Sequence, residues 1–145
     1  MDDLDRLLIR ILQYDGRTSN AGIARSVGVS EGTVRRRLNR LVQEEYIQVV
    51  ALPNHSKMGL ESRALIGIQV DPGKIDEIAD YLLELEEISW LTVTTGSFDI
   101  FAWTMQPSAE ALGIFLRTKI GAIHGVHRTE TFISLSDKKR GITPK

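Results

Sequence analysis

The segment Ser30–Leu41, which reads SEGTVRRRLNRL, constrains the fold of this chain more than any other stretch. It opens with serine, a preferred N-cap residue, and carries four arginines within six positions. At about 100° per residue, its apolar residues Val34, Leu38 and Leu41 form one narrow stripe. A helix that packs through one apolar edge and presents a cationic face outward suits the major groove of DNA.

The polar positions of this segment are the candidate DNA contacts. We expect Thr33, Arg36 and Arg40 in the groove, because the planar arginine fork matches O6 and N7 of guanine. Ser30 and a flanking arginine are expected on phosphates. The alternative is a solvated cationic helix without a nucleic-acid partner. The complete expected set is Ser30, Gly32, Thr33, Arg35, Arg36, Arg37, Asn39 and Arg40.

The residues before this segment predict two further helices. Apolar residues at helical spacing, with acidic residues at the start, indicate a helix from Asp2 or Asp3 to Tyr14. A second helix is capped by Ser19 or Asn20 and is followed by Gly28, which suits the left-handed position after a helix. Helix, short glycine turn and helix together form a helix-turn-helix.

A change in composition marks a boundary between two domains. The β-prone segment 46–52 ends at Pro53 and is expected to leave the helical domain as a strand, which makes that domain winged-helix-like. All eight basic residues before Pro53 are arginine, whereas six of the ten after it are lysine. We predict a helix-turn-helix domain over 1–52, a linker over 53–62, a second domain over 63–136 and a polar tail over 137–145.

The second half has the order strand, helix, strand, strand, helix, strand. Strands are predicted over 64–70, 88–95, 98–105 and 129–135, and helices over 72–86 and 107–120. Gly96-Ser97 separates the two middle strands as a hairpin turn. The βαββαβ order is that of a ferredoxin-like domain, in which helices cover one face of a four-stranded sheet. The chain is therefore predicted to be an α+β protein.

The other face of this sheet is expected to be apolar and uncovered. The strand 98–105 is apolar on both of its sides, and so is Phe132-Ile133 in the last strand, whereas a sheet face in water alternates with polar residues. Stacking the sheet on the sheet of a second copy would remove these apolar side chains from water, so we predict a homodimer through this domain. The alternative is that the linker or the tail covers the face. Two copies would place two cationic helices about 34 Å apart on one side of the duplex.

Composition limits the remaining function classes. The formal net charge of −1 means that any DNA binding must use a local patch. The chain has no cysteine, which excludes disulfides and thiolate sites. Neither a membrane span nor a signal peptide is indicated, so we expect a cytoplasmic protein without a membrane partner. His124 and His127 have no third ligand nearby, so we expect loop histidines rather than a metal site.

Short motifs follow one another in a characteristic order along the chain: Leu4-Asp5, Asp15-Gly16-Arg17, Val27-Gly28-Val29-Ser30, Thr33-Val34, Lys57-Met58-Gly59, Thr95-Gly96-Ser97-Phe98-Asp99 and Thr129-Glu130-Thr131. This ordered set resembles the Lrp/AsnC family, also called feast/famine regulators, over almost the whole length. The resemblance implies an N-terminal domain that binds double-stranded DNA and a C-terminal ligand-sensing domain that dimerises and often builds octamers. In that family, amino acids or related metabolites bind near the hairpin, at contacts between dimers.

Carried over to this chain, the resemblance places a candidate effector site at the hairpin. Asp99 would hold an ammonium group, while backbone N–H groups and threonine hydroxyls near Gly96 would take a carboxylate. The alternative is structural, because any tight hairpin needs Gly96-Ser97 and Asp99 would cap the turn. No other cofactor is expected. The candidate set is Thr94, Thr95, Gly96, Phe98 and Asp99.

Two other functions are compatible with the same scaffold. A nucleoid-type architectural protein would wrap DNA without an effector. A siroheme decarboxylase-like enzyme would use histidine and arginine on a tetrapyrrole, but the second half shows no cluster of these residues. We therefore expect a transcriptional regulator of amino-acid or related metabolism, without catalytic residues.

Overall fold

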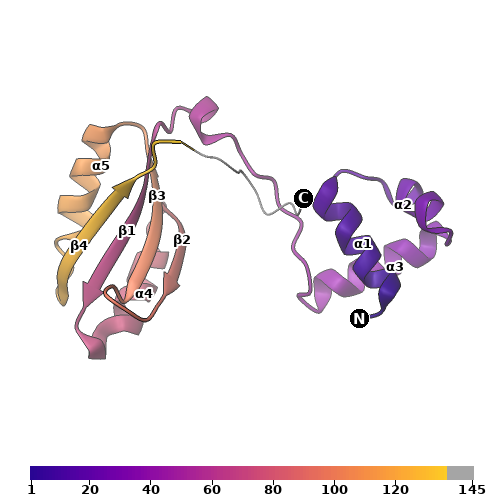
Figure 1. Cartoon of the computed structure of the whole chain (residues 1–145), viewed down its shortest axis with the longest axis horizontal. Coiled ribbons are helices and arrows are strands. Elements are labelled where there is room, and N and C mark those ends of the chain that lie inside the picture. Colours follow the sequence, from indigo (N-terminus) through magenta and orange to yellow (C-terminus); the bar gives the residue numbers. More distant parts are fainter. Residues whose placement is uncertain (137–145) are drawn as a thin grey trace. The chain divides into compact units, whose positions relative to one another are not determined.

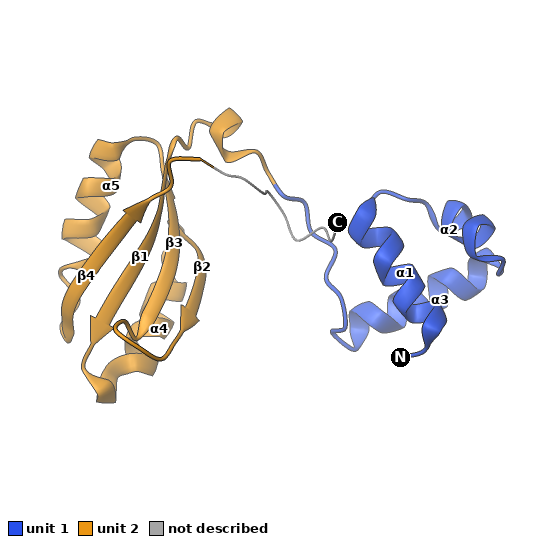
Figure 2. Cartoon of the chain, viewed as in Figure 1, with its two compact units in different colours: residues 1–52, 139–145 blue, residues 53–138 orange. Residues whose placement is uncertain are grey.

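The computed structural model describes residues 1–136, so the predicted polar tail lies outside the described residues. The chain divides into two compact units, Met1–Leu52 and a second unit that begins at Pro53 (Figure 2). Each unit is built from the elements that the sequence pattern favours, with the exceptions given below. No helix within residues 1–136 is long and apolar enough to cross a bilayer.

The first unit consists of three helices, α1 (Asp3–Tyr14), α2 (Asn20–Val27) and α3 (Glu31–Gln43) (Figure 1). Each begins after a residue whose side chain accepts a backbone N–H of the first turn: Asp2, Ser19 and Ser30. At α1 the cap is reciprocal, because the carboxylate of Asp5 accepts the N–H of Asp2 at 3.0 Å in return. The three predicted helices are confirmed.

One core holds these helices together. Leu8 of α1, Ile23 of α2 and Val34 of α3 are completely buried in a single apolar cluster. Gly28 makes the tight turn between α2 and α3 with a φ of 73°, and its N–H donates to the carbonyl of Ala24 at 2.9 Å. This geometry confirms the helix-turn-helix that the spacing predicts.

The prediction of a strand over residues 46–52 is wrong. These residues form no strand, and Val49, Val50 and Leu52 are exposed. A strand needs a neighbouring strand to bond its N–H and C=O groups, and residues 1–52 contain no strand at all. The first unit is therefore a helix-turn-helix in which no strand forms a wing.

The second unit begins with a short 3₁₀ turn, η1 (His55–Met58), within the segment predicted as a linker. Its remaining elements confirm the βαββαβ order. They are β1 (Ser62–Val70), η2 (Pro72–Lys74), α4 (Ile75–Leu83), β2 (Ile88–Val93), β3 (Ile100–Gln106), α5 (Ala109–Phe115), η3 (Leu116–Ile120) and β4 (Val126–Ile133). Most boundaries shift by one to three residues from the prediction, and both helices are shorter than predicted. At the hairpin, β3 starts at Ile100, because Phe98 and Asp99 belong to the loop, and β4 starts at Val126 rather than at residue 129.

The four strands form one antiparallel sheet in the order β2-β3-β1-β4 (Figure 1). Its inner face packs against the helices in a core that includes Ile66 and Ile68 of β1, Ile78 of α4, Ile100 of β3 and Phe115 of α5. This is the predicted ferredoxin-like arrangement, with both helices on one face.

The opposite face of the sheet, which we call the open face, carries a cluster of apolar side chains beside the ion pair of Arg128 and Glu130. Leu65 of β1 pairs with Trp103 of β3 on one side and with Phe132 of β4 on the other, so all three side chains share this face. Trp90 of β2 lies opposite Trp103. Trp90 is 50% exposed and Phe132 is 45% exposed. One face of the sheet is therefore covered by helices, and the other carries an apolar cluster that no helix of its unit covers within the described residues.

Candidate nucleic-acid interface and effector loop

The outward side of α3 forms a shallow hollow of charged and amide side chains. Five of the six lining residues belong to the set that the sequence predicts for DNA contact. The sixth, Gln43, was missed, although it follows Asn39 by four residues and therefore lies on the same helix face. The lining residues are Gly32, Arg35, Arg36, Asn39, Arg40 and Gln43. Such a surface offers donors that can reach base edges and phosphates.

The two predicted hydroxyl contacts lie together at the N-terminal end of α3. Ser30 Oγ accepts the N–H of Thr33 at 3.1 Å and lies 2.9 Å from Thr33 Oγ1. Each hydroxyl carries one proton, and this pair uses only one of the two as a donor. The other proton remains for a phosphate, at a helix end where backbone N–H groups favour anions.

Arg37, one of the two flanking arginines expected to contact phosphates, forms ion pairs within its own unit. Its Nη1 donates to Asp2 Oδ2 at 2.6 Å and to Asp5 Oδ1 at 2.9 Å, and its side chain is only 24% exposed. Arg40 has two roles. Its Nη2 donates to Asp5 Oδ2 at 2.6 Å, and the residue also lines the hollow of α3. The helical projection of α3 alone could not include these partners, since both belong to α1 and its cap. Arg37 therefore has two carboxylate partners within its own unit.

These ion pairs change the protonation equilibria of the three groups. The hydrogen bond from Arg37 lowers the pKa of Asp2 from its ordinary value of 3.8 to about 2. Burial raises the pKa of Asp5, but the N–H of Asp2 and the guanidinium groups of Arg37 and Arg40 outweigh it, so the pKa of Asp5 is lowered. The hydrogen bonds to Asp2 and Asp5 raise the pKa of Arg37. All charges in this cluster therefore persist at neutral pH.

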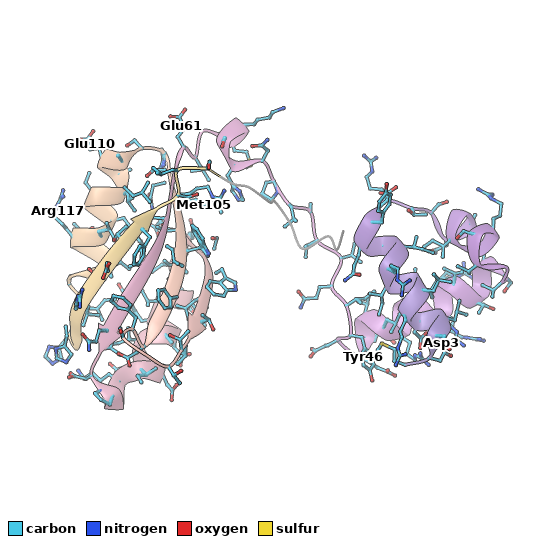
Figure 3. The ribbon with its side chains drawn as sticks, viewed as in Figure 1. Asp3, Tyr46, Glu61, Met105, Glu110 and Arg117 are labelled. Carbon is cyan, nitrogen blue, oxygen red and sulfur yellow. The ribbon has the colours of Figure 1, made fainter. Side chains whose placement is uncertain are left out.

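Acid is expected to destabilise the helical unit through Asp2. Because its pKa is lower in the folded state, Asp2 contributes its full stabilisation above pH 3.8 and loses it as the pH falls toward about 2. Thermal melts of the full chain, followed by circular dichroism, should show a smaller acid-induced drop for Asp2→Asn than for the wild type. Asp3→Asn, at an exposed carboxylate on the first turn of α1, is the control and should follow the wild type (Figure 3). Equal drops for the wild type and Asp2→Asn would contradict this assignment.

The candidate effector loop joins β2 to β3. Gly96 has a φ of 117°, a conformation that side chains other than glycine disfavour, so the turn requires it. Asp99 Oδ2 accepts the N–H of Val70 at 2.9 Å, and the Thr94 hydroxyl donates to the carbonyl of Phe98 at 2.8 Å. Two of the three predicted polar side chains, Thr94 and Asp99, therefore also hold the loop, as the structural alternative requires. Among the described residues, Asp99 Oδ1 has no hydrogen-bond partner.

The aromatic ring of Phe98 anchors this loop to the sheet. A Cβ on Gly67 of β1 would lie 2.8 Å from the ring, so the ring packs directly over the glycine. Phe101 meets the ring edge-on at 5.7 Å between centroids, and the Arg128 guanidinium lies 5.6 Å from its centroid. The sequence alone did not identify Gly67 and Arg128 as neighbours of this loop, because only the sheet register brings β1 and β4 beside it.

His124 and His127 belong to neither of the two candidate sets of residues. His127 Nε2 lies 2.6 Å from Asp71 Oδ1, which joins β4 to the end of β1. His124 lines a separate hollow with Glu77, Tyr81 and Lys119. Within residues 1–136, no group of three side chains is placed to hold a metal ion.

Comparison with known families matches both halves of the chain. Residues 1–42 match the AsnC-type helix-turn-helix domain. Residues 63–143 match the Lrp/AsnC ligand binding domain. The first match contains five of the six residues that line the hollow of α3, and the second contains the loop around Gly96.

Individual proteins match over nearly the full length. An HTH-type transcriptional regulator of Pyrococcus furiosus is 42% identical over 142 residues, which cover 97% of this chain and 96% of that protein. The structure of Escherichia coli AsnC has a TM-score of 0.89 at 30% identity and covers 99% of both chains. The leucine response regulatory protein of Mycobacterium tuberculosis has a TM-score of 0.86 at 29% identity, covering 99% of this chain and all of that one.

Proposed function

Because this chain belongs to the Lrp/AsnC family of transcriptional regulators, we propose that it controls genes of amino-acid or related metabolism as a sequence-specific DNA-binding dimer modulated by a small molecule. The families and relatives that it matches are regulators and not enzymes. The observation that carries the proposal is the outward hollow of α3, where arginine and amide side chains gather on a helix held from behind by a buried core. A regulator of this kind acts on DNA in the cytoplasm.

In this proposal α3 enters the major groove. Arg36 and Asn39 reach base edges, since arginine pairs with guanine and asparagine with adenine through two hydrogen bonds each. Gly32 adds no side chain at the start of α3, so the helix backbone can approach the DNA closely. Thr33 lies in the groove, while Ser30 and Arg35 contact phosphates, which fix the register of the helix on the duplex.

A single recognition helix makes too few contacts for tight binding, so the proposal includes a homodimer. The open face supplies the interface: its aromatic and aliphatic side chains are exposed on one chain and become buried when two sheets stack. A two-fold dimer presents two copies of α3 to a palindromic operator with half-sites one helical turn apart. Assembly of dimers into an octamer extends the same proposal.

The effector is proposed to be an amino acid bound at the loop around Gly96. Asp99 Oδ1 supplies an acceptor for the ammonium group, and the exposed backbone around Gly96 supplies N–H donors for the carboxylate. One structural relative is named as a leucine response regulatory protein, which is consistent with this ligand class. Because the loop is exposed, a second dimer would complete the site.

Calorimetry with a panel of amino acids tests the effector. We expect binding heat with at least one of them, and loss of that heat in Asp99→Asn. The amide keeps an oxygen for the Val70 N–H but lacks the charge that attracts an ammonium. Asp71→Asn is the matched control, since it neutralises another carboxylate of the same unit and should retain the heat. Heat that survives in Asp99→Asn would place the ligand elsewhere.

Selection of genomic fragments by the purified full-length protein tests the regulator function. We expect enrichment of a few palindromic sites upstream of metabolic genes, with enrichment that changes when the bound amino acid is added. Uniform recovery of all fragments without any response to amino acids would instead favour an architectural DNA-binding protein. No recovery of DNA would refute the proposal.

A further inference from the structure

Asp5 is a fully buried carboxylate between the first helix and the recognition helix. Its side chain is 1% exposed, and both of its oxygens accept hydrogen bonds from arginines of α3. Oδ1 accepts from Arg37, and Oδ2 accepts from Arg40 and from the N–H of Asp2. A helix cap needs only the last of these bonds. Asp5 therefore does more than begin α1.

The buried carboxylate divides the cations of α3 into two groups. Arg35 and Arg36 are exposed and line the hollow. Arg37 forms ion pairs with Asp2 and Asp5, and one guanidinium nitrogen of Arg40 forms an ion pair with Asp5. Two of the four arginines are thus opposed by two carboxylates within the same unit, which reduces the positive charge that α3 offers to DNA.

Reducing that charge has a predictable effect on DNA recognition. Arginines that reach phosphates strengthen binding to every sequence equally, whereas contacts to base edges separate one sequence from another. An arginine that is paired with a buried carboxylate gains less binding free energy from a phosphate. It must first break the existing ion pair, which leaves the carboxylate buried without a partner. Holding Arg37 back therefore lowers non-specific affinity and leaves the base-reading residues in place.

We propose that Asp5 is a positioning residue that sets the DNA specificity of α3 by keeping Arg37 off the phosphates and fixing Arg40 at the edge of the hollow. This inference rests on the proposed DNA-binding function. Asp5 itself touches no DNA and acts only through the two arginines. A purely structural link between α1 and α3 would affect stability but would not change the number of phosphate contacts.

The test measures how the affinity of the full-length protein depends on salt, for an operator fragment and for a random duplex. The slope of log K against log salt steepens by about 0.9 for each added phosphate contact. We expect Asp5→Asn to steepen both slopes by about one contact and to raise random-duplex affinity by up to about eightfold at 0.1 M salt. The ratio of operator to random affinity should fall.

Asp3→Asn is the matched control, because it removes the same charge from the same turn of α1. Asp3 is fully exposed and lies 3.6 Å from Arg6 (Figure 3). Asp3→Asn should leave the number of phosphate contacts unchanged. Equal slopes for Asp5→Asn and Asp3→Asn would overturn the proposal.

Arg37→Gln keeps the proposal testable if Asp5→Asn fails to fold. In the otherwise unchanged protein, Arg37→Gln should leave the salt slope as it is, since Arg37 makes no phosphate contact. In the Asp5→Asn background it should restore the original slope. If Arg37→Gln alone lowers the slope by one contact, Arg37 already binds a phosphate and the proposal is wrong. Absence of DNA binding by the unaltered protein would instead refute the proposed function itself.

Discussion

A glutamate in place of Phe132 is expected to convert the proposed dimer into a monomer and to weaken operator binding by about 100-fold or more. Phe132 lies on the open face, pairs with Leu65 and is 45% exposed in the single chain. Its removal therefore costs the isolated domain little. In a dimer that stacks two open faces, each copy would bury an unpaired carboxylate, which costs several kcal/mol.

The loss of DNA binding follows from the loss of the dimer. A linked second recognition helix binds as an intramolecular event, which raises the overall affinity by about 10²–10⁴ over one helix alone. A monomer retains α3 and its hollow but loses this gain. The variant should consequently bind single half-sites as the wild-type helix does and lose the preference for paired half-sites.

Light scattering and a mobility-shift assay together test this expectation. Tyr81→Glu is the matched control, because Tyr81 is an aromatic residue that is 46% exposed but lies on α4, on the other side of the sheet. It should remain a dimer with full operator affinity. Trp90→Glu, on another strand of the open face, should repeat the effect of Phe132→Glu. A dimer that persists in both open-face variants would contradict the proposed interface.

The parts of the fold that sequence alone predicted are those set by local rules. The caps Ser19 and Ser30 and the glycine turn at Gly28 define α2 and α3 through contacts within four residues, and these elements agree with the prediction. The same holds for the apolar alternation of β1. Residues 98–105 are predicted as one strand, but Phe98 and Asp99 belong to the loop, where the Phe98 ring covers Gly67 and the Asp99 carboxylate accepts the N–H of Val70.

What the sequence could not supply are contacts between distant segments. The helical projection of α3 assigned Arg37 to the DNA, since it contains no information about Asp2 and Asp5, more than 30 residues away. The opposite error affected residues 46–52, whose β-prone composition predicted a strand although the unit contains no strand to pair with it. In both cases tertiary partners, present or missing, decided the outcome over local propensity.

Alanine in place of Arg36 is expected to lower operator affinity by about 1–3 kcal/mol, or roughly fivefold to 150-fold. Arg36 is exposed on the outward side of α3 and lines the hollow between Gly32 and Arg40, one turn away on either side. Unlike Arg37 and Arg40, it has no ion-pair partner among the described residues, so its guanidinium is available to a guanine.

The distinction between base and phosphate contact decides how this result is interpreted. If Arg36 reads a base, Arg36→Ala should weaken operator binding much more than random-duplex binding and relax selection at one position of the site. If it contacts a phosphate, both affinities should fall together and the salt slope should decrease by about 0.9. Arg10→Ala, which removes an exposed arginine from α1, controls for the loss of one positive charge. Because Arg36 lies at the centre of the hollow, unchanged operator affinity in Arg36→Ala would remove the structural basis for placing this face of α3 in the groove.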